Sequence, residues 1–259
     1  MAEPTIAPSP PCFCYSDGDY EPHLRALFGR LVGPDWCCLD VGANIGANTL
    51  ALAALATAGR VAAFEASARN FAHLQANAAA LPPPKAEMTL VHAAAWDQPG
   101  SVDLADSDEL AGGSHVTWQA ETLDGLEQVW GLPDAEFTYT TRIERVAAIR
   151  LDDWVAANLG RVDLIKLDVE GAEQHALRGA RQTLARQRPL LVTEYNPTPL
   201  EPASPPDQYF RLLQQLFETV QLIEDDGSLS EPLRSWQALE QRLAVGKGWE
   251  DLLCTPPHA

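Results

Sequence analysis

The sequence is poor in basic residues. Only 18 lysines and arginines stand against 36 aspartates and glutamates, which gives a formal net charge of −18. A surface that acidic repels phosphate backbones and anionic lipid headgroups, because it has no cationic face with which to displace their counterions. We therefore expect neither nucleic acid nor a membrane surface as a partner.

Long apolar runs and paired cysteines are also missing. No stretch reaches the roughly 18 apolar residues of a membrane-spanning helix, and residues 1–11 (MAEPTIAPSPP) lack the basic start and apolar core of a secretory signal. The five cysteines form no even set, and no second Cys or His pair at metal-ligand spacing accompanies Cys12 and Cys14. We expect a flexible, thiol-bearing N-terminal tail and a reduced, cytoplasmic location.

From residue 36 onward, short apolar runs alternate with longer segments of helical period. This alternation is typical of βαβ units and a parallel sheet, so we predict an α/β fold. Residues 1–35 are expected to form a tail and a lead-in helix, and residues 36–259 a single domain. The predicted core strands are 37–41, 61–64, 88–95, 162–167, 190–193, 220–223 and 249–254.

Residues 96–145 interrupt this rhythm. A turn at Asp97–Gly100 and a Gly112-Gly113 pair separate short runs in which apolar and polar residues alternate. We predict an inserted antiparallel excursion on the substrate side, followed by an edge strand over Arg145–Leu151.

A glycine-containing loop joins the first predicted strand to its helix, in the stretch Leu39–Thr49. Gly42 and Gly46 allow a tight turn and a close approach to a ligand, while the helix start at Asn48 and Thr49 presents unpaired amides. A dinucleotide-binding loop requires G-x-G-x-x-G, but Asn44 takes the place of the middle glycine.

The acid before this loop narrows the choice of ligand. Asp40 lies two residues before Gly42, where a carboxylate would repel a pyrophosphate and attract an ammonium or sulfonium group. S-adenosylmethionine carries both an ammonium and a sulfonium group. Glu65 follows the second strand, the position from which an acid accepts ribose hydroxyls in dinucleotide folds. Alternatively, Glu65 is only an acid that complements a helix start.

With these residues in view, the sequence resembles the FkbM family of class I S-adenosylmethionine-dependent methyltransferases. The likeness extends from about residue 36 to the final strand. It is carried by Leu39–Gly46, Phe64–Ala66, the turn after Ala93–Ala95, the block Asp163–Glu173 and Leu191–Glu194.

The resemblance implies a Rossmann-like, doubly wound sheet of seven mostly parallel strands, the last of them antiparallel. It also implies S-adenosylmethionine at the carboxyl edge of the first strands. The cofactor-binding positions would be Gly42, Asn44 and Gly46 against the methionine part with Asp40 near its ammonium group, Asn48 and Thr49 at the helix start, Glu65 and Ala66 at the ribose, and Ala95 and Asp97 in the turn bordering the adenine. Acceptors in the family are hydroxyls of polyketides, sugars and other metabolites, so we expect a small-molecule or sugar acceptor.

Two acids follow the fourth core strand, where the methyl group would be presented. Asp168 or Glu170 could remove the acceptor proton, orient the acceptor hydroxyl or hold a divalent cation. Asp168 could instead cap the following helix. His115 in the excursion is a third candidate base, provided that its loop folds over the site. Glu194 could line the acceptor side.

Two other functions remain open on the sequence. One is an NAD(P)-dependent oxidoreductase, which Asp40 and the missing middle glycine disfavour. The other is a scaffold that binds the cofactor without turnover. The sequence identifies neither the acceptor nor the oligomeric state.

Overall fold

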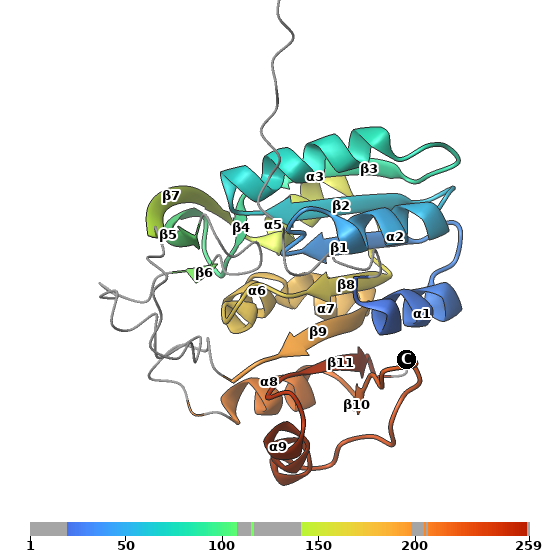
Figure 1. Ribbon diagram of the computed structural model, residues 1–259, viewed down its shortest axis with the longest axis vertical. Coiled ribbons are helices and arrows are strands. Elements are labelled where there is room, and N and C mark those ends of the chain that lie inside the picture. The colour runs from blue at the N-terminus through green and yellow to red at the C-terminus, as the bar shows by residue number, and fades with distance from the viewer. Residues whose placement is uncertain (1–19, 108–114, 117–140, 198–204, 206, 258–259) are drawn as a thin grey trace, which may run out of the picture.

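A computed structural model of the protein describes residues 20–107, 115–116, 141–197, 205 and 207–257. Its main sheet has seven strands in the order β3-β2-β1-β8-β9-β11-β10 (Figure 1). Among the seven strands described in this sheet, β11 alone runs in the opposite direction to the other six, which confirms the predicted mostly parallel sheet with an antiparallel last strand. The strands are β1 Cys37–Val41, β2 Arg60–Glu65, β3 Glu87–His92, β8 Leu164–Leu167, β9 Leu190–Tyr195, β10 Thr219–Leu222 and β11 Glu250–Thr255.

Helices cover both faces of this sheet, which explains why its central strands are almost continuously apolar. The helices packed on one face are α1 Pro22–Leu31, α2 Ala47–Leu55 and α3 Ala68–Ala80. Those on the other face are α5 Leu151–Asn158, α6 Glu173–Gly179, α7 Arg181–Gln187, α8 Gln208–Leu216 and α9 Trp236–Val245. Alternation along β1 divides the burial, since Leu39 and Val41 pack on the α5–α9 side and Cys38 on the α1–α2 side.

A second sheet lies beyond the carboxyl ends of the parallel strands, at the left of Figure 1. Its order is β4-β7-β5-β6, with β4 Ala94–Ala95, β5 Gly100–Ser107, β6 His115–Val116 and β7 Thr141–Ile149. This is the predicted excursion, and β5 pairs with both β6 and β7 antiparallel. The predicted edge strand at 145–151 is wrong. The strand ends at Ile149 and lies between β4 and β5, and Leu151 instead begins α5.

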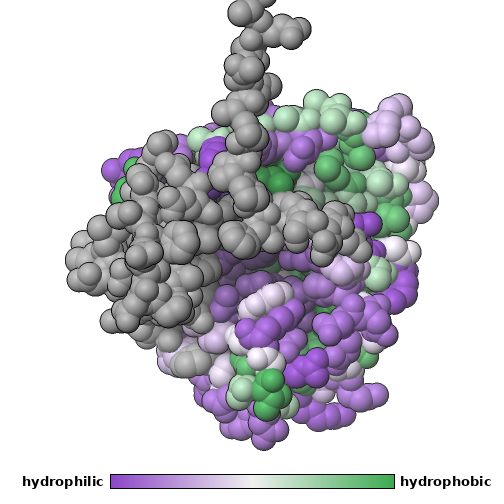
Figure 2. Space-filling model, in the orientation of Figure 1, coloured by the Kyte–Doolittle hydropathy of each residue, from purple (hydrophilic) through white to green (hydrophobic). Residues whose placement is uncertain are grey.

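Some helices also differ from the prediction. The lead-in helix exists as α1, whereas α9 has no counterpart in the prediction. The expected single helix after β8 is broken at Ala180 into α6 and α7. A Cβ at Gly179 would lie 2.0 Å from the carbonyl oxygen of Trp96, so the main chain after β4 approaches the helix at this break. Figure 2 shows the outer surface, with hydrophobic side chains gathered over α2.

Candidate functional site

A row of charged side chains crosses the carboxyl edge of the sheet on the α1–α2 side. Asp40 of β1 lies opposite Lys166 of β8 in the parallel register, and Glu194 of β9 lies opposite Asp251 of β11. Their strand neighbours two residues away belong to the apolar cluster beneath α1 and α2. The period of two in each strand therefore brings these four charges onto one face of the sheet.

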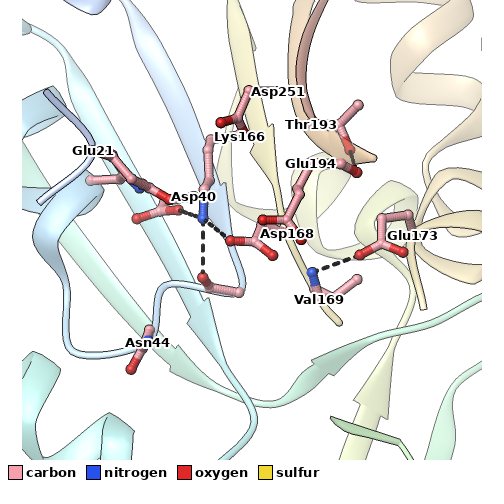
Figure 3. A network of polar contacts seen from close by, with 12 residues as sticks. Glu21, Asp40, Asn44, Lys166, Asp168, Val169, Glu173, Thr193, Glu194 and Asp251 are labelled. Carbon is pink, nitrogen blue, oxygen red and sulfur yellow. Dashed lines mark hydrogen bonds and ion pairs between the residues drawn. The ribbon is translucent and has the colours of Figure 1, made fainter. Parts of the chain in front are cut away.

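Lys166 is the centre of this row (Figure 3). Its Nζ lies 3.0 Å from Asp168 Oδ2, 3.5 Å from the Gly42 carbonyl oxygen and 4.0 Å from Asp40 Oδ1. Burial by itself would lower the pKa of Lys166, but Asp168, Asp40 and Glu21 outweigh burial and hold that pKa well above its usual value. The ammonium group is therefore charged and fixed between carboxylates that come from three different elements.

Asp40 lies behind the cleft surface. Its side chain is fully buried, and Oδ2 accepts a hydrogen bond of 2.5 Å from the Thr49 hydroxyl. Oδ1 has no hydrogen-bond partner among the described residues. Burial raises the pKa of Asp40, while Lys166 and Thr49 oppose the increase.

A cleft opens beside this row, where β1, β2 and β8 end and the second sheet begins. It encloses about 720 Å³ including its open mouth. Its lining residues are Tyr20, Gly42, Asn44, Phe64, Glu65, Ala66, Asn70, Ala93, Ala94, Ala95, Leu104, Asp168, Val169, Glu170 and Ala172.

Glu65 forms one wall of the cleft at the end of β2. The backbone amide of Asn44 donates to Glu65 Oε2 and that of Ser67 to Oε1, each at 2.7 Å. Each carboxylate oxygen has a second lone pair, so both can still accept a ligand hydroxyl. Burial raises the pKa of Glu65 to about 7, and the two amides limit the rise. Asn44 Oδ1 is buried without a partner in the described part of the chain.

The opposite wall is the loop from Asp168 to Ala172. Glu173 holds this loop in place, because its Oε1 accepts from the amide of Val169 at 3.0 Å (Figure 3) and from the amide of Gly171 at 3.2 Å. Glu170 has a left-handed backbone with φ of 51°, a conformation that costs free energy in a residue with a side chain. Asp168 does not cap a helix, since the next helix begins at Glu173 with Ala172 as its N-cap.

The close approach of the Asp168–Ala172 loop requires a glycine at position 42. Its φ is 83°, and a Cβ there would lie 1.6 Å from the carbonyl oxygen of Asp168. The glycine loop after β1 and the acidic loop after β8 therefore meet through their main chains.

Burial hinders the ionisation of acids at and near the cleft. Burial raises the pKa of Glu173 to about 7. It also raises the pKa of Glu170 and of Glu194 above their usual range, with Asp168 as the next cause for both. A cationic ligand placed among these groups would relieve their mutual repulsion.

The structure brings most of the predicted site residues to the cleft. Those that line it are Gly42, Asn44, Glu65, Ala66, Ala95, Asp168 and Glu170. Asn48 lines a small adjoining hollow above Lys166 and donates to Glu21 at 2.6 Å. Asp40, Gly46, Thr49 and Asp97 do not line the cleft, and Asp97 instead bonds His175 Nδ1 at 3.0 Å.

His115 lies on β6 opposite Ala105, one residue from the cleft-lining Leu104, and its side chain is outside the described residues. Cys12, Cys14 and residues 117–140 of the inserted segment are likewise outside them. Cys37, Cys38 and Cys254 are free thiols.

Sequence reasoning missed the parts of the site that depend on tertiary contacts. Glu173 and Lys166 enter the sequence analysis only within the block Asp163–Glu173 and have no predicted role of their own. Tyr20 and Glu21 fall in the predicted tail and lead-in helix. An isolated lysine in an apolar strand is itself a signal, because an unpaired charge would not be buried there.

Neither a metal site nor a membrane segment is found in the described ranges. No group of three or more His, Cys, Asp or Glu side chains there has a geometry suited to a metal ion. The divalent cation considered from the sequence thus has no support. None of the helices described is long and apolar enough to cross a bilayer.

Comparisons with known proteins agree with this geometry. The profile of the Methyltransferase FkbM domain matches residues 40–224. The 2-O-methyltransferase NoeI of Sinorhizobium fredii (strain NBRC 101917 / NGR234) is 30% identical over 182 residues, which are 66% of this chain and 68% of NoeI.

Solved structures with low sequence identity also align. An rRNA methylase from Streptococcus thermophilus is 9% identical with a TM-score of 0.46, over 92% of this chain and 96% of its own. An O-methyltransferase from Bacillus cereus is 14% identical with a TM-score of 0.41, over 90% of this chain and 81% of its own.

Proposed function

The chain belongs to the FkbM methyltransferase family and is an S-adenosylmethionine-dependent methyltransferase; from this premise we propose that it methylates a hydroxyl group of a small molecule or sugar. The observation that carries the proposal is the cleft between Glu65 and the loop that bears Asp168. One wall offers an acceptor for ribose hydroxyls, and the other offers carboxylates beside the place where a methyl group would be presented.

The residues present fit S-adenosylmethionine. Glu65 can accept hydroxyl donors at both oxygens, and the buried acids would be stabilised by the ammonium and sulfonium charges. Asn44 supplies a carbonyl oxygen that has no partner in the described part of the chain. Asp40 does not line the cleft, so it would act on the cofactor indirectly, through its ion pair with Lys166.

Bound S-adenosylmethionine supplies an electrophilic methyl group, whose C–S bond breaks as the new C–O bond forms. The protein has to hold the acceptor oxygen in line and accept its proton. We assign the proton to Asp168, whose Oδ2 is fixed by Lys166, with Glu170 as the alternative. Glu173 keeps both acids in place by fixing the loop that carries them.

The name of the relative supports a sugar-like acceptor. NoeI is a 2-O-methyltransferase, and the likeness covers two thirds of its length. The free thiols of Cys37, Cys38 and Cys254 are consistent with the reduced, cytoplasmic location that we continue to propose.

Titration calorimetry of the purified protein tests the proposed function. We expect saturable binding of S-adenosylmethionine and S-adenosylhomocysteine and none of NAD or NADP. Glu65→Ala should weaken binding by about ten- to a hundredfold, because a charge-assisted hydrogen bond contributes about 1.5–3 kcal/mol. The exposed Asp153→Asn on α5 is the control and should bind as the wild type does. Binding of a dinucleotide without binding of either adenosyl ligand would refute the proposal.

A further inference from the structure

Tyr20, two residues before α1, lies at the cofactor cleft, although it is outside the region that matches the family. The match begins at residue 40, yet Tyr20 lines the cleft together with Gly42 and Asp168. Tyr20 also borders the hollow above Lys166 and a shallow hollow between α1 and α2. It is the residue that the three openings share.

The residue after Tyr20 is fixed in the charged row. Glu21 has a left-handed backbone with φ of 46°, directly before Pro22. Its Oε2 accepts a hydrogen bond of 2.6 Å from Asn48 Nδ2. Together with Asp168 and Asp40, which have larger effects, Glu21 raises the pKa of Lys166 against the opposing effect of burial (Figure 3). The turn at Glu21 therefore has a defined geometry, and it directs Tyr20 toward the cleft.

The helix behind this turn is held at two places. Leu24, Leu27 and Phe28 are almost completely buried in the apolar cluster between α1, α2 and the main sheet. His23 Nε2 lies 2.7 Å from Asp251 Oδ2, and Asp251 is the partner of Glu194 in the register of β11 and β9. Tyr20 therefore extends from an anchored helix, so its position at the cleft is set before any ligand binds.

We infer that Tyr20 contacts the sulfonium end of the cofactor and makes the site prefer the methylated cofactor over its demethylated product. This inference rests on the proposed function. Glu65 would hold the ribose of the bound cofactor and the Gly42 loop its methionine part, which would bring the sulfur near Asp168. Tyr20 lies at this end of the cleft, because it lines the small hollow above Lys166 together with Gly42 and Asp168.

The aromatic ring of Tyr20 would favour the charged cofactor over its neutral product. The face of an aromatic ring attracts a cation, and the attraction grows where water is excluded. S-adenosylmethionine carries a positive sulfur, whereas the thioether of S-adenosylhomocysteine is neutral. Tyr20 thus stabilises the cofactor before methyl transfer more than the product afterwards, which favours exchange of product for fresh cofactor.

Calorimetry with the two ligands on the same variants separates this role from simple packing. Tyr20→Leu should weaken S-adenosylmethionine binding by about 5- to 30-fold and S-adenosylhomocysteine binding by less than about 3-fold. Tyr20→Phe keeps the ring and should leave both affinities within about twofold of the wild type. Leu50→Ala is the control, since Leu50 lines the hollow between α1 and α2 but not the cleft.

Glu21→Ala tests the anchor. If Glu21 is a positioning residue, its loss should reproduce the selective weakening of S-adenosylmethionine binding. Equal losses for the two ligands with Tyr20→Leu, or no loss, would overturn the inference while leaving the proposed function intact. Failure of the wild type to bind either ligand would overturn both.

Discussion

Asp168 differs from the other acids of the cleft because a buried cation holds it. Lys166 fixes Oδ2 at 3.0 Å, so the carboxylate is oriented before an acceptor arrives. We predict that Asp168→Asn keeps cofactor affinity within a few fold yet lowers turnover by about 10²–10⁴, the usual contribution of a positioned base. The measurement is S-adenosylhomocysteine formed with any polyhydroxylated acceptor that the wild type methylates.

Two variants delimit that assignment. Asp153→Asn, on an exposed turn of α5, should have wild-type turnover. If Asp168→Asn and Glu170→Gln both keep near-normal turnover, neither carboxyl removes the proton, and Glu194 or His115 becomes the next residue to test.

At the scale of the element, the loop after β8 depends on one acceptor atom. Glu173 Oε1 accepts from both Val169 and Gly171, so its loss would leave two amides without partners. We predict that Glu173→Leu lowers the free energy of unfolding by about 1–3 kcal/mol and reduces turnover as Asp168 and Glu170 lose their positions. Chemical denaturation and the same methyl-transfer assay measure the two effects.

The conservative variant distinguishes positioning from charge. Glutamine keeps a carbonyl oxygen at the same place, so Glu173→Gln should restore most of the stability and turnover that Glu173→Leu loses. An equal defect in both variants would show that the charge of Glu173 matters, instead of its role as an acceptor.

The elements also show what sequence reasoning could and could not find. The parallel strands were predicted because each is a short apolar run bounded by turn residues, and Gly42 and Glu65 because they follow such runs. Helix α9 was missed because Trp236–Val245 mixes charged and apolar residues, and only its packing on the α5–α9 side reveals the buried face.

The missing site residues have a similar cause. Tyr20 and Glu21 are far from the glycine loop in sequence, and the anchoring of α1 brings Tyr20 to the cleft and Glu21 to Asn48 and Lys166. The family resemblance implies that the turn containing Asp97 borders the adenine, and the structure adds that the Asp97 carboxylate bonds His175 on α6. Local pattern gives the edge of the sheet at which a residue lies, and tertiary contacts decide which side chains reach the ligand.

For the whole molecule, the buried acids make stability depend on pH. Burial raises the folded-state pKa of Glu65 and Glu173 to about 7 from a usual value of 4.5. The folded state therefore holds protons that the unfolded state has already released between these values. The stabilising contribution is complete below pH 4.5 and is lost as the pH rises through 7, by about 3 kcal/mol for each group.

We predict that the protein without cofactor melts at a higher temperature at pH 5.5 than at pH 8. Circular dichroism melts across this range measure the slope. Glu173→Gln should flatten it, whereas Glu240→Gln, at an exposed position of α9, should not. A melting temperature that rises steadily from pH 5.5 to 8 would contradict the assignment of these acids as destabilising when ionised.

The place of β11 in the sheet has a consequence for synthesis. Among the described strands, β10 bonds to the main sheet only through β11, and β11 bonds directly to β9. As the ribosome extends the chain, the β9 edge stays open after Thr219–Leu222 has emerged, until Glu250–Thr255 follows. During that interval the nascent chain carries an unpaired strand edge, which is a template for pairing with other chains and a natural target for chaperones.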